Sequence, residues 1–146
     1  MPDILLTPEV QAWATGFPLT LLHAGAALLM LAAGSFVYGL ITPYREIGLI
    51  RDGNIAAGIS FGALLAALAM PLASVLAAAA SLEDIALWGA ATLCVQLAVF
   101  RLIDLLLHDL PQRIERGEVA AAAVLAGAKI GGSLLLAAAV GPWAAR

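Results

Sequence analysis

Four long apolar segments dominate this sequence and limit the folds that it can adopt. They span residues 19–41, 54–80, 82–107 and 118–140. Each exceeds the ~20 residues that an α-helix needs to cross a hydrocarbon core of ~30 Å. A membrane-spanning strand would need only ~10 residues of alternating polarity, and these segments do not alternate. The sequence therefore predicts an all-α membrane protein with four transmembrane helices.

Charged residues are too few to cover a water-soluble protein of this size. Of the 146 residues, 63% are hydrophobic and only 12% are charged, and the mean hydropathy is +1.01. A soluble domain carries roughly 25% charged residues. The net charge of −3 also excludes a basic surface for nucleic acid. We expect the lipid bilayer to surround most of the chain.

Helix caps and breakers mark the ends of the segments. Ser81 and Asp84 have the spacing of a capping box, and Asn54 is a favourable N-cap for the second helix. Pro18 suits a first helical turn, and Gly141 with Pro142 suits a helix end. We expect an N-terminal tail at residues 1–18, loops at 42–53 and 108–117, and a C-terminal end at 143–146.

The arginines predict the orientation of the chain. The two loops contain Arg45 and Arg51, and Arg113 and Arg116, whereas the other side has only Arg146. Short loops rich in Lys and Arg stay in the cytoplasm. Both termini are therefore predicted to lie on the periplasmic side.

The two loops also resemble each other. Arg51, Gly53 and Asn54 precede an apolar residue and two alanines, and the same order recurs in the second loop with Arg116-Gly117-Glu118. This similarity predicts two duplicated helical hairpins, at residues 19–80 and 81–142, which run parallel to each other.

Several motifs resemble the bacterial domain of unknown function 350 family, the YjfL-like inner-membrane proteins. The most specific motif is the Arg-x-Gly-Asn-x-Ala-Ala sequence that starts at Arg51. The resemblance implies a four-helix inner-membrane protein, often encoded beside envelope-stress proteins, with no assigned activity and so no catalytic residues to carry over. The matching residues are Tyr38, Thr42-Pro43-Tyr44, Leu49-Ile50-Arg51, Gly53-Asn54-Ile55-Ala56-Ala57, Pro71-Leu72-Ala73-Ser74, Trp88-Gly89 and Gln96.

Lys129 is a charged residue near the middle of the fourth segment. It follows Glu118 by roughly 16 Å of helix, about half-way across a ~30 Å core. A central lysine costs about 2.5–3.5 kcal/mol on insertion. One interpretation is an amine that lines an ion or proton path, within reach of Gln96 on the third helix. The other is a lysine that extends toward water or binds a carbonyl at an oligomer interface.

Arg101, Asp104 and His108 share one face near the end of the third segment. Their spacing allows Arg101 and Asp104 to pair. Such a group can form a proton or cation entry site. It can also be an ion pair at the membrane interface, where a helix C-terminus favours a cation.

Two small-residue motifs predict helix packing. Gly58 and Gly62 lie four residues apart in the second segment, as do Gly127 and Gly131 in the fourth. Such spacing allows helices to approach closely. The contact can join the two halves of one chain or neighbouring protomers.

No motif for a catalytic site is present. The sequence lacks paired catalytic carboxylates, a phosphate-binding loop and clustered metal ligands, so we expect no enzyme activity, no cofactor and no metal. The predicted function is a homo-oligomeric envelope or membrane-stress component that acts through lipids or partner proteins. The alternative is an oligomeric channel or carrier for an ion or small solute.

Overall fold

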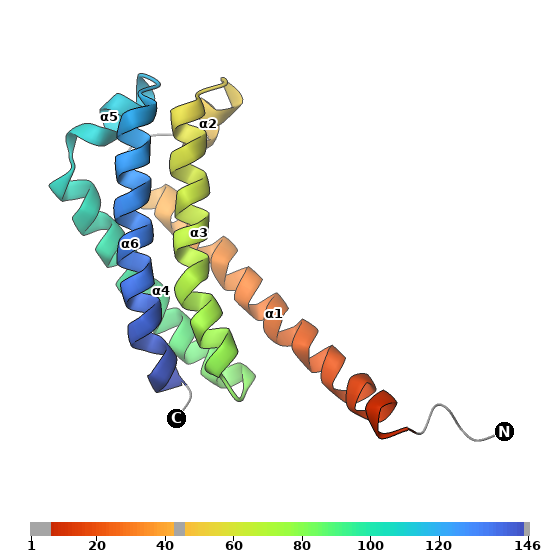
Figure 1. Ribbon diagram of the computed structural model, residues 1–146. Helices are drawn as coiled ribbons and strands as arrows, with labels where there is room; N and C mark the ends of the chain where they lie inside the picture. Colours follow the sequence, from red (N-terminus) through yellow and green to blue (C-terminus); the bar gives the residue numbers. More distant parts are fainter. Residues whose placement is uncertain (1–6, 43–45, 145–146) are drawn as a thin grey trace.

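The computed structural model describes residues 7–42 and 46–144, and these residues form helices without any strand. Four helices are long and two are short (Figure 1). Residues 1–6 of the predicted tail, Arg45 and Arg146 lie outside the described residues, as do Pro43 and Tyr44. The helices are α1 (Pro8–Ile41), α2 (Glu46–Arg51), α3 (Ile55–Ala78), α4 (Leu82–Leu106), α5 (Asp109–Glu115) and α6 (Val119–Ala144).

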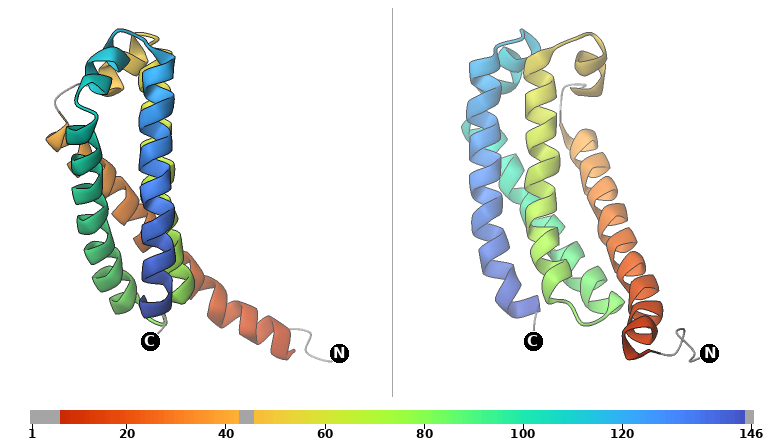
Figure 2. Two further views of the ribbon diagram at one scale, coloured as in Figure 1. Left: turned by 60° about the vertical axis from the view of Figure 1, so that its left-hand side comes forward. Right: turned by 45° about the vertical axis from the view of Figure 1, so that its right-hand side comes forward.

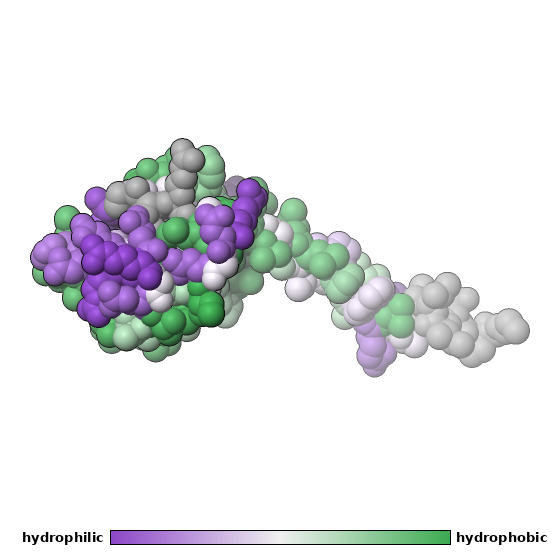
Figure 3. All heavy atoms as spheres, turned by 90° about the horizontal axis from the view of Figure 1, so that it is seen from above, coloured by the Kyte–Doolittle hydropathy of each residue, from purple (hydrophilic) through white to green (hydrophobic). Residues whose placement is uncertain are grey.

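The four long helices are long and apolar enough to span a membrane. The short helices α2 and α5 both lie at one end of the bundle, which we call the arginine end (Figure 1). The helix α1 begins, and α6 finishes, at the opposite end. Viewed from the arginine end, hydrophilic residues gather over the bundle, and apolar residues surround them (Figure 3). This distribution is the one expected of a protein with a water-facing end and lipid-facing flanks.

Two helices extend beyond their predicted bounds. The first begins at Pro8 because the Thr7 hydroxyl accepts a hydrogen bond from the Val10 amide at 3.4 Å and Pro8 fits a first helical turn. Pro18 therefore lies inside α1 instead of opening it. Likewise α6 continues through Pro142 to Ala144. A proline near a helix end removes one backbone hydrogen bond, and water can satisfy the freed carbonyl there.

The caps that the sequence predicts are present. Ser81 and Asp84 exchange two hydrogen bonds of 3.1 Å and form the capping box of α4. The Asn54 side chain accepts from the Ala57 amide at 3.0 Å and caps α3. These bonds matter because an unsatisfied backbone amide in lipid costs several kcal/mol.

The two predicted loops contain short helices that end in the same turn. Gly53 and Gly117 both have a φ of 84°, a left-handed conformation that favours glycine. In the first loop the amides of Gly53 and Asn54 donate to the carbonyls of Ile50 and Leu49. The amides of Gly117 and Glu118 donate in the same way to Ile114 and Arg113. Both turns thus have the Schellman pattern. The two halves share this local structure, and the duplication itself stays a prediction.

The centre of the bundle is the pair α3 and α6, which run side by side in the same direction (Figures 1 and 2). Small side chains on both helices, such as Ala57 and Ala122, are fully buried. Small residues allow helix backbones to approach closely, which is the common packing mode inside membranes. A larger apolar group where α1, α3 and α4 meet consists of Tyr38, Leu64, Ala67, Leu68, Leu72, Leu93 and Phe100.

The helix α1 leans away from the other helices over its first half (Figures 1 and 2). Apolar side chains there are exposed, including Trp13 at 64% and Leu22 at 54%. Closer to the arginine end α1 returns to the bundle, where Gly34 and Tyr38 are buried. This half of α1 brings a residue into the polar site described below.

The glycine motifs of α3 and α6 do not form the contact between these helices. Gly62, Gly127 and Gly131 are exposed. A Cβ atom built at these positions, or at Gly58, meets nothing within 4 Å. The sequence allows these glycines to join the two halves of one chain or to join neighbouring protomers. The structure does not show them joining the two halves.

Candidate functional site

The centre of the candidate site is the ammonium group of Lys129, which is fully buried inside the bundle. Lys129 lies on the inner face of α6, one turn after Leu125 and Ala126 and one turn before Ser133. A buried charge is costly unless it is paired and hydrogen-bonded. The surrounding helices provide that pairing.

Asp104 of α4 and Tyr38 of α1 bind Lys129. The Lys129 Nζ lies 3.1 Å from Asp104 Oδ1 and also donates a hydrogen bond to the Tyr38 hydroxyl. The Tyr38 hydroxyl in turn donates to Asp104 Oδ2 at 3.4 Å. The side chain of Asp104 is 10% exposed, whereas that of Lys129 is 1% exposed. The three groups therefore form a closed network that joins three of the four long helices.

Two aromatic rings enclose the ammonium. The Lys129 Nζ lies 4.4 Å from the ring centroid of Tyr38 and 5.4 Å from that of Phe100. The two rings are perpendicular, with centroids 6.1 Å apart. Both distances fall within the range of cation–π attraction. The rings thus add attraction for a cation while they exclude lipid from it.

Gln96 lies beside this network but does not bind Lys129, although the sequence placed it within reach. Its Nε2 atom donates to the Ser133 hydroxyl, and that hydroxyl donates to the Lys129 carbonyl at 2.7 Å. Gln96 is fully buried, and its Oε1 atom receives no hydrogen bond from any residue that the structure describes. The expected contact is therefore indirect and runs through the backbone of α6.

Glu46 of α2 is a further buried acid near the site, 6% exposed. Its Oε1 accepts a hydrogen bond from the Ser60 hydroxyl of α3 at 3.3 Å, and its charge attracts the Lys129 ammonium. The sequence predicts a loop at this position, and Glu46 is not among the predicted site residues. Its position between an apolar segment and the Arg51 motif gave no sign that α2 folds back onto α3.

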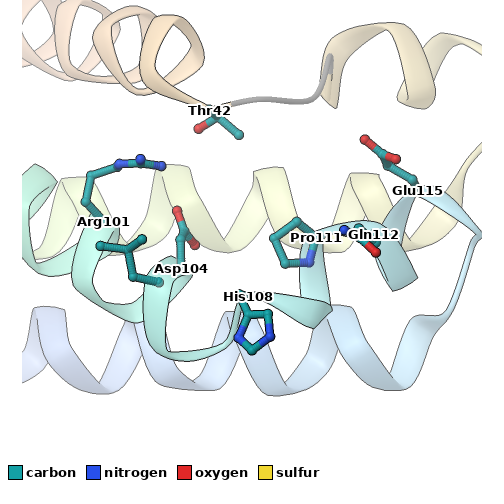
Figure 4. Close-up of a pocket in the computed structure, with 8 residues that line it drawn as sticks. Thr42, Arg101, Asp104, His108, Pro111, Gln112 and Glu115 are labelled. Carbon is teal, nitrogen blue, oxygen red and sulfur yellow. The ribbon is translucent and has the colours of Figure 1, made fainter.

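A cavity of about 440 Å³ lies where the end of α1, the last turns of α4 and the helix α5 meet, and Asp104 is among its lining residues (Figure 4). Asp104 lines this cavity and its carboxylate also binds Lys129, so the network borders the cavity. The lining residues are Thr42, Arg101, Asp104, Leu105, His108, Pro111, Gln112 and Glu115.

Arg101 and His108 also line the cavity, but neither binds Asp104. Asp104 pairs with Lys129, and the predicted Arg101–Asp104 pair does not form, because Asp104 points between the helices toward α6. The His108 Nε2 lies 3.0 Å from Asp109 Oδ1, and both side chains are exposed. The three residues of the predicted face thus share one cavity without forming one network.

The residues of the repeated loop motif fix the turns at the arginine end. Asn54 Nδ2 donates to the carbonyls of Ile114 and Glu115, at 2.9 and 3.2 Å, and so ties the first loop to the second. Arg51 and Arg116 are exposed. These contacts indicate a structural role for the motif.

An exposed ion pair connects α5 to the start of α6. Arg113 donates from Nε to Glu118 Oε2 at 2.7 Å, and its terminal nitrogen lies 2.6 Å from the same oxygen. The hydrogen bond and the positive charge of Arg113 lower the pKa of Glu118. The same hydrogen bond and the negative charge of Glu118 raise the pKa of Arg113. The pair lies outside the cavity and contributes to the loop alone.

Among the described residues, no group of three or more His, Cys, Asp or Glu side chains could hold a metal ion. The site has instead a carboxylate, a phenol and an amine in mutual contact. These groups can exchange protons, and the carboxylate faces a cavity from which a proton or small cation can arrive.

Comparison with known proteins supports a membrane location. Residues 12–140 match the family described as Domain of Unknown Function (DUF350). The chain is 34% identical to the UPF0719 inner membrane protein YjfL of Escherichia coli K12 over 103 residues, which are 70% of this chain and 78% of that protein. The protein of the same name from E. coli O157:H7 matches equally. No solved structure matches.

Proposed function

The chain belongs to the DUF350 family of membrane proteins, and we propose that it moves protons or small cations through the network of Lys129, Asp104 and Tyr38. The observation that carries this proposal is the contact between a buried Lys129 and an Asp104 that lines a cavity. We propose no enzymatic reaction and no cofactor.

The packing of four helices does not require a charged network. A buried ion pair is weak support for stability, since apolar residues of similar size often serve as well or better. Ionisable groups inside a membrane are costly and commonly mark ion or proton paths. Lys129 and Asp104 with an accessible carboxylate fit that pattern.

The path is open on one side only. The polar groups continue from Asp104 past Lys129 to Gln96 and Ser133. Beyond them, apolar side chains such as Leu72 and Leu93 fill the bundle. We propose that this apolar region closes the path in the present conformation and that a movement of α1 opens it.

We propose that the arginine end faces the cytoplasm and both termini face the periplasm. Arg51, Arg113 and Arg116 lie at this end, and arginine-rich short loops remain cytoplasmic. The cavity would then take its proton or cation from the cytoplasm.

Proton flux into liposomes tests this function. Pure protein is inserted into vesicles that hold a pH-sensitive dye, and a membrane potential is imposed. We expect Lys129→Met and Asp104→Asn to abolish the flux, while Arg116→Gln at an exposed loop position retains it. Normal flux in Lys129→Met with an intact oligomeric state would refute the proposal.

A second candidate function rests on the exposed apolar half of α1. We propose that α1 and the exposed glycines of α3 and α6 allow the protein to form a homo-oligomer or to bind a partner in the envelope. Trp13 stacks on Phe17 with ring centroids 5.2 Å apart, and both side chains are exposed. The proposed role in membrane stress rests only on the resemblance of this chain to a family whose members are often encoded beside envelope-stress proteins.

Cross-linking in native membranes tests this second function. A cysteine at Leu22 on the exposed face of α1 should form a specific cross-link, to a second copy or to a partner. A cysteine at the buried Leu64 is the matched control. Absence of any cross-link at Leu22 would contradict this function without affecting the first.

A further inference from the structure

The cavity at the arginine end has a charge distribution that a proton path does not need. Arg101 is partly buried in its wall, and its guanidinium makes no ion pair or hydrogen bond within residues 7–42 and 46–144. An arginine without a partner at the edge of a membrane is an unfilled site for an anion. A guanidinium binds phosphate through two parallel hydrogen bonds.

Among the lining residues, the acid that balances no other charge lies at the far end of the cavity from Arg101. Glu115 carries a carboxylate there, and Figure 4 shows Arg101 and Glu115 at opposite ends of the lining side chains. The charge of Asp104 between them is balanced by Lys129. His108 pairs with Asp109. The cavity therefore presents one cationic and one anionic end to a ligand.

We propose that this cavity binds the headgroup of a phospholipid with a primary ammonium, such as phosphatidylethanolamine. The phosphate contacts Arg101, and the ammonium donates hydrogen bonds to Glu115. A choline headgroup has no N–H to donate, and a glycerol headgroup has no positive charge for Glu115. The volume of about 440 Å³ lies within the range of small-ligand sites.

Apolar surface next to the cavity favours a lipid over a soluble phosphate compound. Leu105 lines the cavity and is 65% exposed. Its neighbours Leu102 and Leu106 are exposed as well, as are Leu40 and Ile41 at the end of α1. Acyl chains can cover these side chains while the headgroup occupies the polar cavity. Such a lipid would lie next to Asp104, at the entrance of the proposed path.

Binding of short-chain lipids to the purified protein in detergent tests this inference. Dioctanoyl phosphatidylethanolamine, phosphatidylcholine and phosphatidylglycerol are compared by native mass spectrometry, with free phosphoethanolamine as the soluble control. We expect the ethanolamine lipid to bind at least several-fold more tightly than the other three. Equal binding of the three lipids, or equally tight binding of free phosphoethanolamine, would overturn the proposal.

Two substitutions separate the two ends of the site. We expect Arg101→Gln to weaken binding of the ethanolamine lipid about tenfold, since the substitution removes a charged hydrogen bond. Arg101→Lys should restore part of the affinity. Glu115→Gln should remove the preference for ethanolamine over choline. The controls are Arg116→Gln and Glu83→Gln, which lie outside the cavity. If the controls change binding as much as Arg101→Gln does, the proposed site is wrong.

The lipid site and the proposed function can fail independently. Lipid binding to Arg101→Gln is measured without any flux assay. Proton flux through Lys129→Met is measured whether or not the protein prefers one lipid. A lipid preference without proton flux would leave the headgroup site standing and refute only the transport function.

Discussion

The ammonium nitrogen of Lys129 lies 3.1 Å from the Oδ1 atom of Asp104, across the contact between α6 and α4. The lysine is fully buried, whereas the aspartate reaches the wall of a cavity. The pair therefore connects the interior of the bundle with this cavity.

Replacing Lys129 with Met should destabilise the fold by about 3–5 kcal/mol, because it leaves the charge of Asp104 inside the bundle without its partner. Asp104→Asn should have a comparable effect. The double variant should be more stable than either single variant, since neither charge then remains alone. Chemical unfolding in detergent micelles measures all three, and additive losses in the double variant would show that the two residues do not interact.

Alanine at Gly53 or at Gly117 should cost about 1 kcal/mol each, because both residues have a φ of 84°, where a Cβ atom is strained. The two losses should be similar, since the two turns have the same hydrogen bonds. Gly62→Ala is the matched control in an open helical position. A large difference between the two loop variants would contradict the similarity of the turns.

The stability that Glu118 contributes should depend on pH. Its pKa is lowered from the ordinary value of 4.5 by the hydrogen bond from Arg113. The contribution is therefore present above the unfolded pKa and is lost as the pH falls through the lower, folded pKa. We expect Glu118→Gln to lower the Tm slightly at neutral pH and to match the native protein in acid. A Tm difference that stays constant with pH would contradict this assignment.

Leucine at Gly127 or Gly131 should leave the folded protomer stable but weaken its self-association. Both positions are exposed, and a Cβ atom there meets no neighbour. The side chain would instead obstruct close approach of a second helix. Analytical ultracentrifugation in detergent measures the oligomeric state. Gly89→Leu is the contrasting variant, because a Cβ atom there lies 2.6 Å from the Met30 Cε atom, so the protomer itself should lose stability.

The class of fold could be predicted from the sequence because length and apolarity are sufficient to identify membrane helices. The four spans, the capping box of Ser81 and the cap of Asn54 are confirmed. The ends of α1 and α6 could not be predicted, because the prolines that the sequence places at these ends, Pro18 and Pro142, lie inside the helices. Helices α2 and α5 are too short for a helical spacing of apolar residues to be recognised in the sequence.

The candidate site could be predicted only in part. Lys129 was recognisable because a charge in mid-membrane is rare. Its partner Asp104 is not predicted, since a helical spacing indicates only neighbours on the same helix and allows Asp104 to pair with Arg101. The contributions of Tyr38 and Glu46 depend on how α1 and α2 pack against other helices. Such contacts between distant segments leave no periodic signal in a single sequence.

At 34 residues α1 is roughly 51 Å long, well above the ~30 Å thickness of a hydrocarbon core. Such a helix must either incline steeply or leave its first turns outside the lipid. The stacked rings of Trp13 and Phe17 are suited to the boundary between lipid and water. The membrane thickness would then set the inclination of α1, and with it the position of the Tyr38 hydroxyl. A thicker or stretched bilayer would therefore alter the hydrogen bond to Lys129 by mechanical means.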